Sequence, residues 1–196
     1  MDPFTVFPDK EIHPVGTIST IFLRMRISSF HSACAYVHQL PYGYNADRDD
    51  LLCLFEDGKG SCTTKHAVIA TLASELDLPV AKWIGIYAMT EELVTGAGDI
   101  IEKHALAYLP MVHCFLSDGR HRVDLTEGNV NGKNGPIDDF LYTRAVEANI
   151  SAKDEYLLYR NALKDRILKR EEFQCVELKT ILQAREEGLG LLKDRI

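Results

Sequence analysis

The feature that most constrains the fold is a helix without a polar face, which follows a glycine-rich turn. Gly58 and Gly60 lead into small hydroxyl residues and Cys62, and apolar residues then recur at helical spacing as far as Leu76. Because few charges lie on any face of this helix, other elements must cover most of it. The hydroxyl residues are suited to capping a helix start, which predicts that Cys62 lies in the first turn.

The predicted position of Cys62 favours ionisation of its thiol. Unpaired amide N–H groups and the positive end of the helix dipole stabilise an anion at a helix start. A thiol in that position loses its proton more easily than a free cysteine, whose pKa is roughly 8.5. The alternative is that Cys62 only packs, since free cysteine is among the most buried residue types.

The clearest β signal lies in residues 111–125. Two alternating runs flank Asp118-Gly119, a pair that tolerates positive φ and favours a two-residue hairpin turn. Such a turn places Ser117 opposite Arg120, and His113 opposite Asp124. Directly opposed residues share a face, so His113 and Asp124 are predicted to lie within reach of each other. The other face is apolar and carries Val112, Cys114, Leu116, Val123 and Leu125.

A cysteine at a helix start, with a histidine and an aspartate paired across a hairpin, is the pattern of an activated nucleophile. Cys62 would attack an acyl carbon, His113 would move the proton, and Asp124 would orient the imidazole. The backbone N–H of Cys62 could contribute to an oxyanion hole. The candidates for a second donor precede the turn and are Gln39, Tyr42, Tyr44 and Asn45.

This pattern resembles the transglutaminase-like superfamily, a branch of the papain-like cysteine-enzyme fold. Gly60-Ser61-Cys62 opens an apolar helix, a strand with Gly85 follows, and His113 and Asp124 lie on successive strands. The resemblance covers residues 28–126 and implies that Cys62 is the nucleophile, His113 the base and Asp124 the third member. It implies acyl-transfer chemistry without identifying a substrate, since the superfamily includes cross-linking enzymes, proteases, deamidases and deglycosylating enzymes, and also inactive binding modules. The loop before Cys62 lacks an obvious family tryptophan.

Two other roles for these side chains are open at the level of sequence. His66 lies four residues after Cys62 on the same helix face and could replace His113 as the base, although Asp124 would then have no histidine to orient. Alternatively, Cys62, His66, His113 and Asp124 could together hold zinc, although no Cys-x-x-Cys pair is present. We expect no metal and no cofactor.

Two further patterns have structural and functional interpretations. The run from Glu127 to Gly132, with Asp138 at the twelfth position, mimics a calcium loop, but it begins with Glu and follows a strand, so we expect an ordinary loop. Trp83, Tyr87 and Phe115 are either core aromatics or the lining of a substrate cleft. We count Trp83, with Tyr44 and Asn45, among the candidate substrate residues.

Composition excludes several functional classes. The formal net charge of −7 argues against nucleic acid and an anionic membrane as partners. No apolar run approaches the roughly 20 residues of a membrane span, and the N-terminus does not resemble a signal peptide. Five cysteines without paired spacing suggest free thiols and a cytoplasmic location.

The remaining chain completes an α+β prediction: a papain-like or transglutaminase-like core with a nucleophile helix packed on an antiparallel sheet. Residues 1 to about 20 read as an extended lead-in, 29–40 as a helix and 80–89 as a strand. We expect the core to span 1–149, and 150–196 to form a helical appendage. One appendage helix begins near residue 152, and a second runs from about 176 until Gly188 and Gly190 end it.

The appendage has an apolar stripe that includes Tyr156, Leu157, Leu163 and Ile167, so it should dock on the core or on a second copy of the chain. The sequence therefore predicts a cysteine-dependent enzyme that acts on a peptide or protein amide, of the protease, amidase or transglutaminase type. The alternative from another class is a catalytically silent scaffold of the same fold that binds a peptide or protein.

Overall fold

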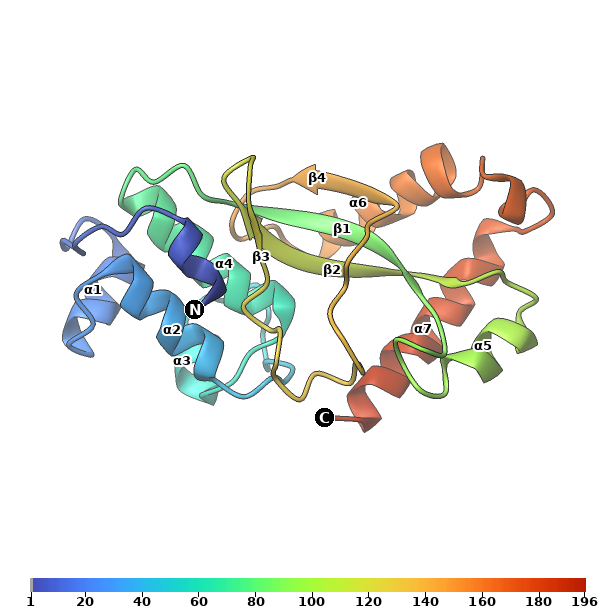
Figure 1. Cartoon of the computed structure of the whole chain (residues 1–196), viewed down its shortest axis with the longest axis horizontal. Coiled ribbons are helices and arrows are strands. Elements are labelled where there is room, and N and C mark those ends of the chain that lie inside the picture. Colours follow the sequence, from blue (N-terminus) through green and yellow to red (C-terminus); the bar gives the residue numbers. More distant parts are fainter. Residues whose placement is uncertain (1) are drawn as a thin grey trace. The chain divides into compact units, whose positions relative to one another are not determined.

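The computed structural model describes residues 2–196 and has an α+β fold. Within this described range, seven α-helices accompany a four-stranded antiparallel sheet with strand order β3-β2-β1-β4 (Figure 1). The helices are α1 (Thr17–Arg24), α2 (Phe30–Gln39), α3 (Cys53–Asp57), α4 (Cys62–Glu75), α5 (Ala97–Lys103), α6 (Ala152–Ala162) and α7 (Leu178–Asp194). The strands are β1 (Ala81–Met89), β2 (Leu109–Ser117), β3 (Arg122–Val123) and β4 (Tyr142–Ala145).

The chain forms two compact units, which differ from the predicted division at residue 149. The first contains residues up to Ile84, Cys114–Asn129 and Ala145–Ser151, and the second contains Gly85–His113, Val130–Arg144 and Ala152–Ile196. Strands β1 and β2 thus contribute residues to both units. The C-terminal helices share their unit with one half of each of these strands.

The core of the first unit forms around α4. Eleven of the fourteen α4 residues are buried, which confirms the predicted helix without a polar face. Helices α1 and α2 pack against it, together with the apolar hairpin residues Leu116, Val123 and Leu125. Helix α2 also agrees with the prediction: it begins after Ser29, whose hydroxyl accepts the Ser32 N–H.

The predicted extended lead-in of residues 1 to about 20 was wrong in part, because a 3-10 helix spans Pro3–Val6 and α1 begins at Thr17. Ile18 and Phe22 are buried on one side of α1, at the four-residue spacing of a helix face. The Glu75 carboxylate accepts the N–H groups of Ile18 and Ser19 at 3.0 and 2.6 Å. A side chain 57 residues away in sequence therefore satisfies the first turn of α1, and the local contribution is the Ser19 hydroxyl, which accepts the N–H of the N-cap residue Gly16 at 2.9 Å.

The hairpin register also differs from the prediction. Leu116 pairs with Val123 and Ser117 with Arg122, so the register is shifted by two residues and Phe115, not His113, is level with Asp124. The connection is a loop of residues 118–121 instead of a two-residue turn. An even shift preserves the alternation of faces on which the predicted pairing of His113 with Asp124 depends.

The side chain of Asp118 explains the wider loop. Its Oδ1 accepts the N–H groups of Arg120 and His121 at 2.8 and 2.7 Å, and its Oδ2 lies 3.0 Å from His121 Nδ1. Gly119 has φ of 88°, the left-handed backbone that glycine adopts without strain. These hydrogen bonds replace those of a tight turn and hold the pKa of Asp118 well below its usual range.

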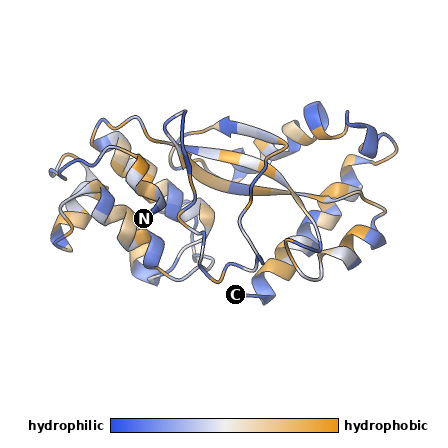
Figure 2. Cartoon of the chain, in the orientation of Figure 1, coloured by the Kyte–Doolittle hydropathy of each residue, from blue (hydrophilic) through white to orange (hydrophobic). Residues whose placement is uncertain are grey.

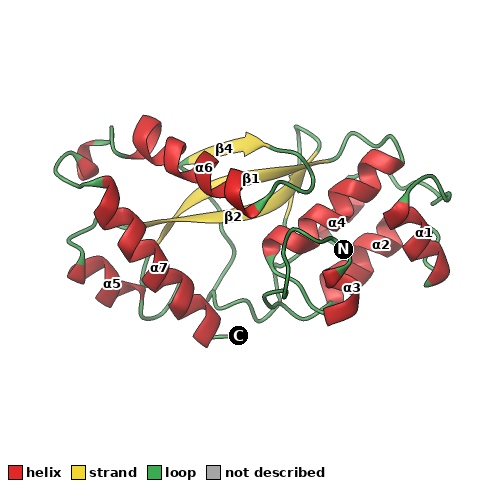
Figure 3. Cartoon of the chain, turned by 180° about the vertical axis from the view of Figure 1, so that it is seen from behind, coloured by secondary structure: helices red, strands yellow, loops and turns green. Residues whose placement is uncertain are grey.

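The second unit has its own core. Its buried members come from β1, β2, α5, α6, α7, the segment between α6 and α7, and the connections on either side of α5. Figure 2 shows the hydrophobic residues along the ribbon of these elements. Helices α5 and α7 lie side by side, as Figures 1 and 3 show from opposite directions. Tyr159, Leu163 and Ile167 are fully buried, whereas Tyr156 and Leu157 are each 39% exposed. The predicted apolar stripe therefore docks through part of its length.

Gly188 does not end α7, which continues through Gly190 to Asp194. The reason is packing: a Cβ at Gly188 would lie 2.7 Å from Leu109 Cδ2. The glycine permits close approach of α7 to β2, where its helix propensity matters less than the contact. The sequence also gave no strand signal for β4, whose four residues are exposed or half-buried.

Candidate active site

Cys62 is the first residue of α4, as predicted. It is 8% exposed, and the preceding Ser61 has the extended backbone of an N-cap residue. The Ser61 side chain makes no capping hydrogen bond, so it does not compete for the N–H groups of the first turn. Such N–H groups and the positive end of a helix dipole stabilise an anion at a helix start.

The two glycines of the preceding turn have different functions. Gly58 ends α3 with φ of 62°, in the left-handed region. At Gly60, a Cβ would lie 2.3 Å from Leu54 Cδ1, so close packing against α3 requires glycine. The Gly60 N–H donates to the Pro41 carbonyl, which anchors the turn before Cys62 to the preceding loop.

His66 connects the first turn of α4 to the segment that carries Asp124. Its side chain is fully buried, and Nε2 accepts the Leu125 N–H at 2.8 Å. The ring proton is therefore assigned to Nδ1, which donates to the Cys62 carbonyl at 2.6 Å. Both ring nitrogens are used by backbone groups, so the geometry contradicts the alternative in which His66 is the catalytic base.

Asp124 directly follows β3. Its Oδ1 accepts the backbone N–H and the hydroxyl of Thr126, each at 2.7 Å. The same oxygen lies 3.4 Å from His66 Nε2, and the Asp124 side chain is 21% exposed. Because Nε2 already accepts the Leu125 N–H, the imidazole is neutral. Its contact with Asp124 is therefore between a neutral ring and a carboxylate, and not between two opposite charges. The carboxylate is held in place and reaches the surface.

His113 lies in β2 and is 2% exposed. Its ring meets that of Tyr87 nearly at a right angle, with centroids 6.3 Å apart. The next residue, Cys114, faces α4: its Sγ lies 3.7 Å from the Thr63 hydroxyl. This contact lies within the first unit, whereas His113 and Tyr87 belong to the second.

A scan against protein-family models, a search of curated proteins and a search of solved structures each found no match.

The expected oxyanion role of Asn45 is not supported by its hydrogen bonds. Its amide nitrogen lies 3.3, 3.0 and 2.9 Å from the Cys53 carbonyl, the Asp57 carboxylate and the Lys59 carbonyl. Its Oδ1 accepts the Thr64 hydroxyl at 2.7 Å. Asn45 therefore fastens the loop to α3 and α4.

The other two candidate substrate residues lie in aromatic pairs. Tyr44 meets Tyr42 edge to face, with centroids 6.3 Å apart. Trp83 is half-buried and stacks on Phe115, with centroids 6.4 Å apart and an interplanar angle of 17°. A partly exposed, stacked indole is compatible with the cleft lining that the sequence suggested, and with core packing.

Lys65 has a structural role that the sequence analysis missed. Its fully buried ammonium donates to the carbonyls of His38 and Leu40 and to Oδ1 of Asn129. Burial lowers the pKa of Lys65 to about 8, and the negative charge of Asp124 opposes that shift. The sequence feature that could have revealed this role is a single lysine in an otherwise apolar helix, because a buried ammonium group must find hydrogen-bond acceptors inside the fold.

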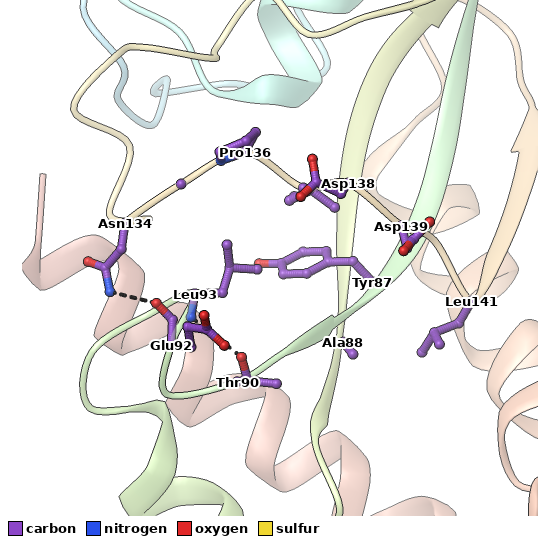
Figure 4. Close-up of a pocket in the computed structure, with 12 residues that line it drawn as sticks. Tyr87, Ala88, Thr90, Glu92, Leu93, Asn134, Pro136, Asp138, Asp139 and Leu141 are labelled. Carbon is purple, nitrogen blue, oxygen red and sulfur yellow. Dashed lines mark hydrogen bonds between the residues drawn. The ribbon is translucent and has the colours of Figure 1, made fainter.

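A cavity of about 460 Å³ in the second unit shares Tyr87 with the surroundings of His113. Figure 4 shows the Tyr87 ring extending into this cavity, with Leu93, Pro136 and Asp138 around it. The volume is typical of small-molecule sites. This cavity therefore lies beside Tyr87, whose ring packs against His113, the predicted base.

Hydrogen bonds join the two loops that line this cavity. The Asn134 backbone N–H donates to the Leu93 carbonyl at 2.8 Å, and its side-chain amide donates to Glu92 and Thr95. The Arg195 guanidinium, one residue beyond α7, donates to the carbonyls of Thr95 and Gly132 and to Asn134 Oδ1. The C-terminal residues thus hold the cavity walls together.

Among residues 2–196, no group of three or more His, Cys, Asp or Glu side chains is arranged to hold a metal ion. Asn129, in the segment that mimics a calcium loop, instead accepts from Lys65 and donates to the His38 carbonyl. All five cysteines are free thiols. No helix in the described range is long and apolar enough to cross a membrane.

Proposed function

We propose that this protein is a cysteine-dependent enzyme that hydrolyses or transfers the acyl group of a peptide or protein amide. Cys62 is the nucleophile, His113 the base and Asp124 the carboxylate that orients it. The arrangement is that of a papain-like, transglutaminase-like core.

The observation that carries this proposal is the link between Cys62 and Asp124 through His66. The ring of His66 bonds to the Cys62 carbonyl on one side and to the Leu125 N–H on the other. The first turn of α4, which carries Cys62, and the segment that carries Asp124 are therefore joined by one buried, neutral side chain.

The proposed reaction has two steps. The Cys62 thiolate attacks the amide carbon, the C–N bond breaks, and the imidazolium of His113 gives its proton to the leaving amine. Water or a second amine then attacks the thioester, passing its proton to His113, and Cys62 leaves as the thiolate. The backbone N–H of Cys62 stabilises the oxyanion of each tetrahedral intermediate.

The test is the pH dependence of alkylation at each cysteine of the full chain, measured by mass spectrometry. Cys62 should reach its maximal rate at lower pH than Cys175, the exposed thiol, because activated cysteines have pKa values of roughly 3.5–7.5. The His113→Ala variant should move the Cys62 profile to higher pH. His121→Ala, at the exposed hairpin tip, is the matched control and should leave it unchanged.

A silent binding scaffold gives the opposite result. Cys62 would then titrate like an ordinary thiol, and His113→Ala and His121→Ala would behave alike. Screening of peptide amides with and without added amines, with Cys62→Ala as the inactive control, separates hydrolysis from transfer.

A further inference from the structure

A separate cavity of about 430 Å³ lies in the second unit, lined by residues of β4, α6 and the segment after α6. Three cationic side chains line it: Arg144 from β4, Arg166 from the segment after α6, and Lys169. Of the lining residues, only Asp165 is acidic. The lining therefore carries an excess of two positive charges, in a chain whose net charge is −7.

In the described part of the chain, none of these three cations is held in an ion pair, although Asp165 lines the same cavity. Across residues 2–196, neither the two guanidinium groups nor the Lys169 ammonium makes an ion pair or a side-chain hydrogen bond. All three residues are exposed, so solvent screens their mutual repulsion, but like charges around one concave surface still repel at low ionic strength. An anion in the cavity would remove this cost and gain charge-assisted hydrogen bonds.

The backbone that presents Arg166 is a π-helical turn, Leu163–Ile167. The Leu168 N–H donates to the Leu163 carbonyl at 2.9 Å, one residue further than in an α-helix. This wider turn keeps Leu163 and Ile167 in the core while Asp165 and Arg166 line the cavity. π-Turns within α-helices are rare and occur frequently at functional sites.

We propose that this cavity binds a small phosphorylated ligand. Two guanidinium groups offer paired donors that match phosphate oxygens, and the Lys169 ammonium adds a compact point charge. The cavity has the volume of a small-molecule site. This inference does not depend on the proposed enzymatic activity, because none of these residues belongs to the candidate active site.

The experiment titrates the full chain with inorganic phosphate, pyrophosphate and citrate by calorimetry at low and physiological ionic strength. Pyrophosphate should bind in a saturable, one-to-one manner, more tightly than citrate, and more weakly as salt is added. Arg144→Gln and Arg166→Gln should each weaken it by about tenfold or more, the loss expected for a charge-assisted hydrogen bond. Lys164→Gln is the matched control, since Lys164 is exposed in the same π-turn but does not line the cavity.

Three results would overturn the proposal: no saturable binding of either phosphate compound, equal weakening by Lys164→Gln and Arg166→Gln, or citrate binding as tight as that of pyrophosphate. The second would indicate a diffuse charge effect, and the third a general anion site. Circular dichroism of each variant shows whether the fold is retained, and Lys169→Gln provides an independent variant if either arginine replacement unfolds.

Discussion

Lys65 and His66 interrupt an otherwise apolar helix, and each is buried because the fold supplies its partners. Lys65 donates to two carbonyls and an amide oxygen, and His66 bonds to two backbone groups. Buried polar groups are tolerated only when such bonds are made. The two residues fasten α4, which begins with Cys62, to the end of α2 and to the segment after β3, which carries Asp124.

Lys65 should make stability depend on pH in the alkaline range. Its pKa is about 8 in the folded protein and 10.5 unfolded, so the unfolded chain binds more protons between these values. The contribution of Lys65 to the free energy of unfolding should therefore rise from pH 8 to 10.5 and stay constant below pH 8. Denaturant titrations of the full chain and of Lys65→Met, compared at pH 7 and pH 10, measure this difference.

Lys153→Met, at an exposed position, is the control for this experiment and should show no comparable change. A difference between the wild type and Lys65→Met that is the same at both pH values would contradict the assignment.

Asp124→Asn tests the proposed orienting carboxylate. Asparagine keeps an oxygen that can accept from Thr126, so the melting temperature should change little. Loss of the charge should lower kcat by about 10²–10⁴-fold, because the imidazole loses the group that fixes its tautomer and stabilises its cation. Steady-state kinetics on an amide substrate, alongside thermal melts, give both quantities, and an active, well-folded variant would remove Asp124 from the mechanism.

At the scale of elements, the glycines of α7 show how packing overrides helix propensity. Gly188 lies against Leu109 and Met111, whereas no atom outside the helix lies within 4 Å of a Cβ at Gly190. Both positions have the same intrinsic preference, since glycine in a helix interior costs about 0.5–1 kcal/mol relative to alanine. Their tertiary surroundings alone distinguish them.

The two alanine replacements should therefore have opposite effects. Gly190→Ala should stabilise the protein by about 0.5–1 kcal/mol through helix propensity. Gly188→Ala should destabilise it by about 1–3 kcal/mol, the usual cost of overpacking, because Leu109 must move. Urea denaturation of both variants measures the difference, and stabilisation by both would show that α7 is not held tightly against β2.

At the scale of the whole molecule, each compact unit has its own core. The C-terminal helices cover the second core, which also contains Ile86, Leu109 and Met111 of the sheet. These sheet residues belong to the part of the chain that the sequence assigned to a core of residues 1–149, with 150–196 as an appendage docked on it or on a second copy of the chain. The second unit therefore depends on residues after 151 for most of its helical cover.

A chain ending at Asn149 should expose this second core. We expect it to bind a hydrophobic dye, to associate at micromolar concentration and to lose cooperative melting of the second unit. Dye fluorescence and light scattering against the full chain test this expectation. A truncated chain as stable and monomeric as the full one would contradict it, and a dimeric full chain would implicate the exposed Tyr156 and Leu157 in self-association.

Strong local patterns allowed much of the fold to be predicted from the sequence. The hydrophobic spacing around Val68 and Leu72 predicted α4, and Ser29 with the apolar positions after it predicted α2. The alternation after Val80 predicted β1. In each case the signal and the element occupy the same short segment, so the local chain carries the information. The assignment of Cys62, His113 and Asp124 as a catalytic triad stays a prediction.

Other features were decided by residues distant in the sequence. Glu75 caps α1, the Asp118 carboxylate sets a wider hairpin loop, Leu109 determines why Gly188 lies inside a helix, and backbone groups of Cys62 and Leu125 hold His66. Apart from the hairpin loop and the bond between His66 and the Cys62 carbonyl within α4, these contacts join different elements. Periodicity shows which side of an element is apolar. It does not show which residue caps a helix end, packs against a glycine or forms a hydrogen bond with a buried imidazole, because these partners come together only when the chain folds.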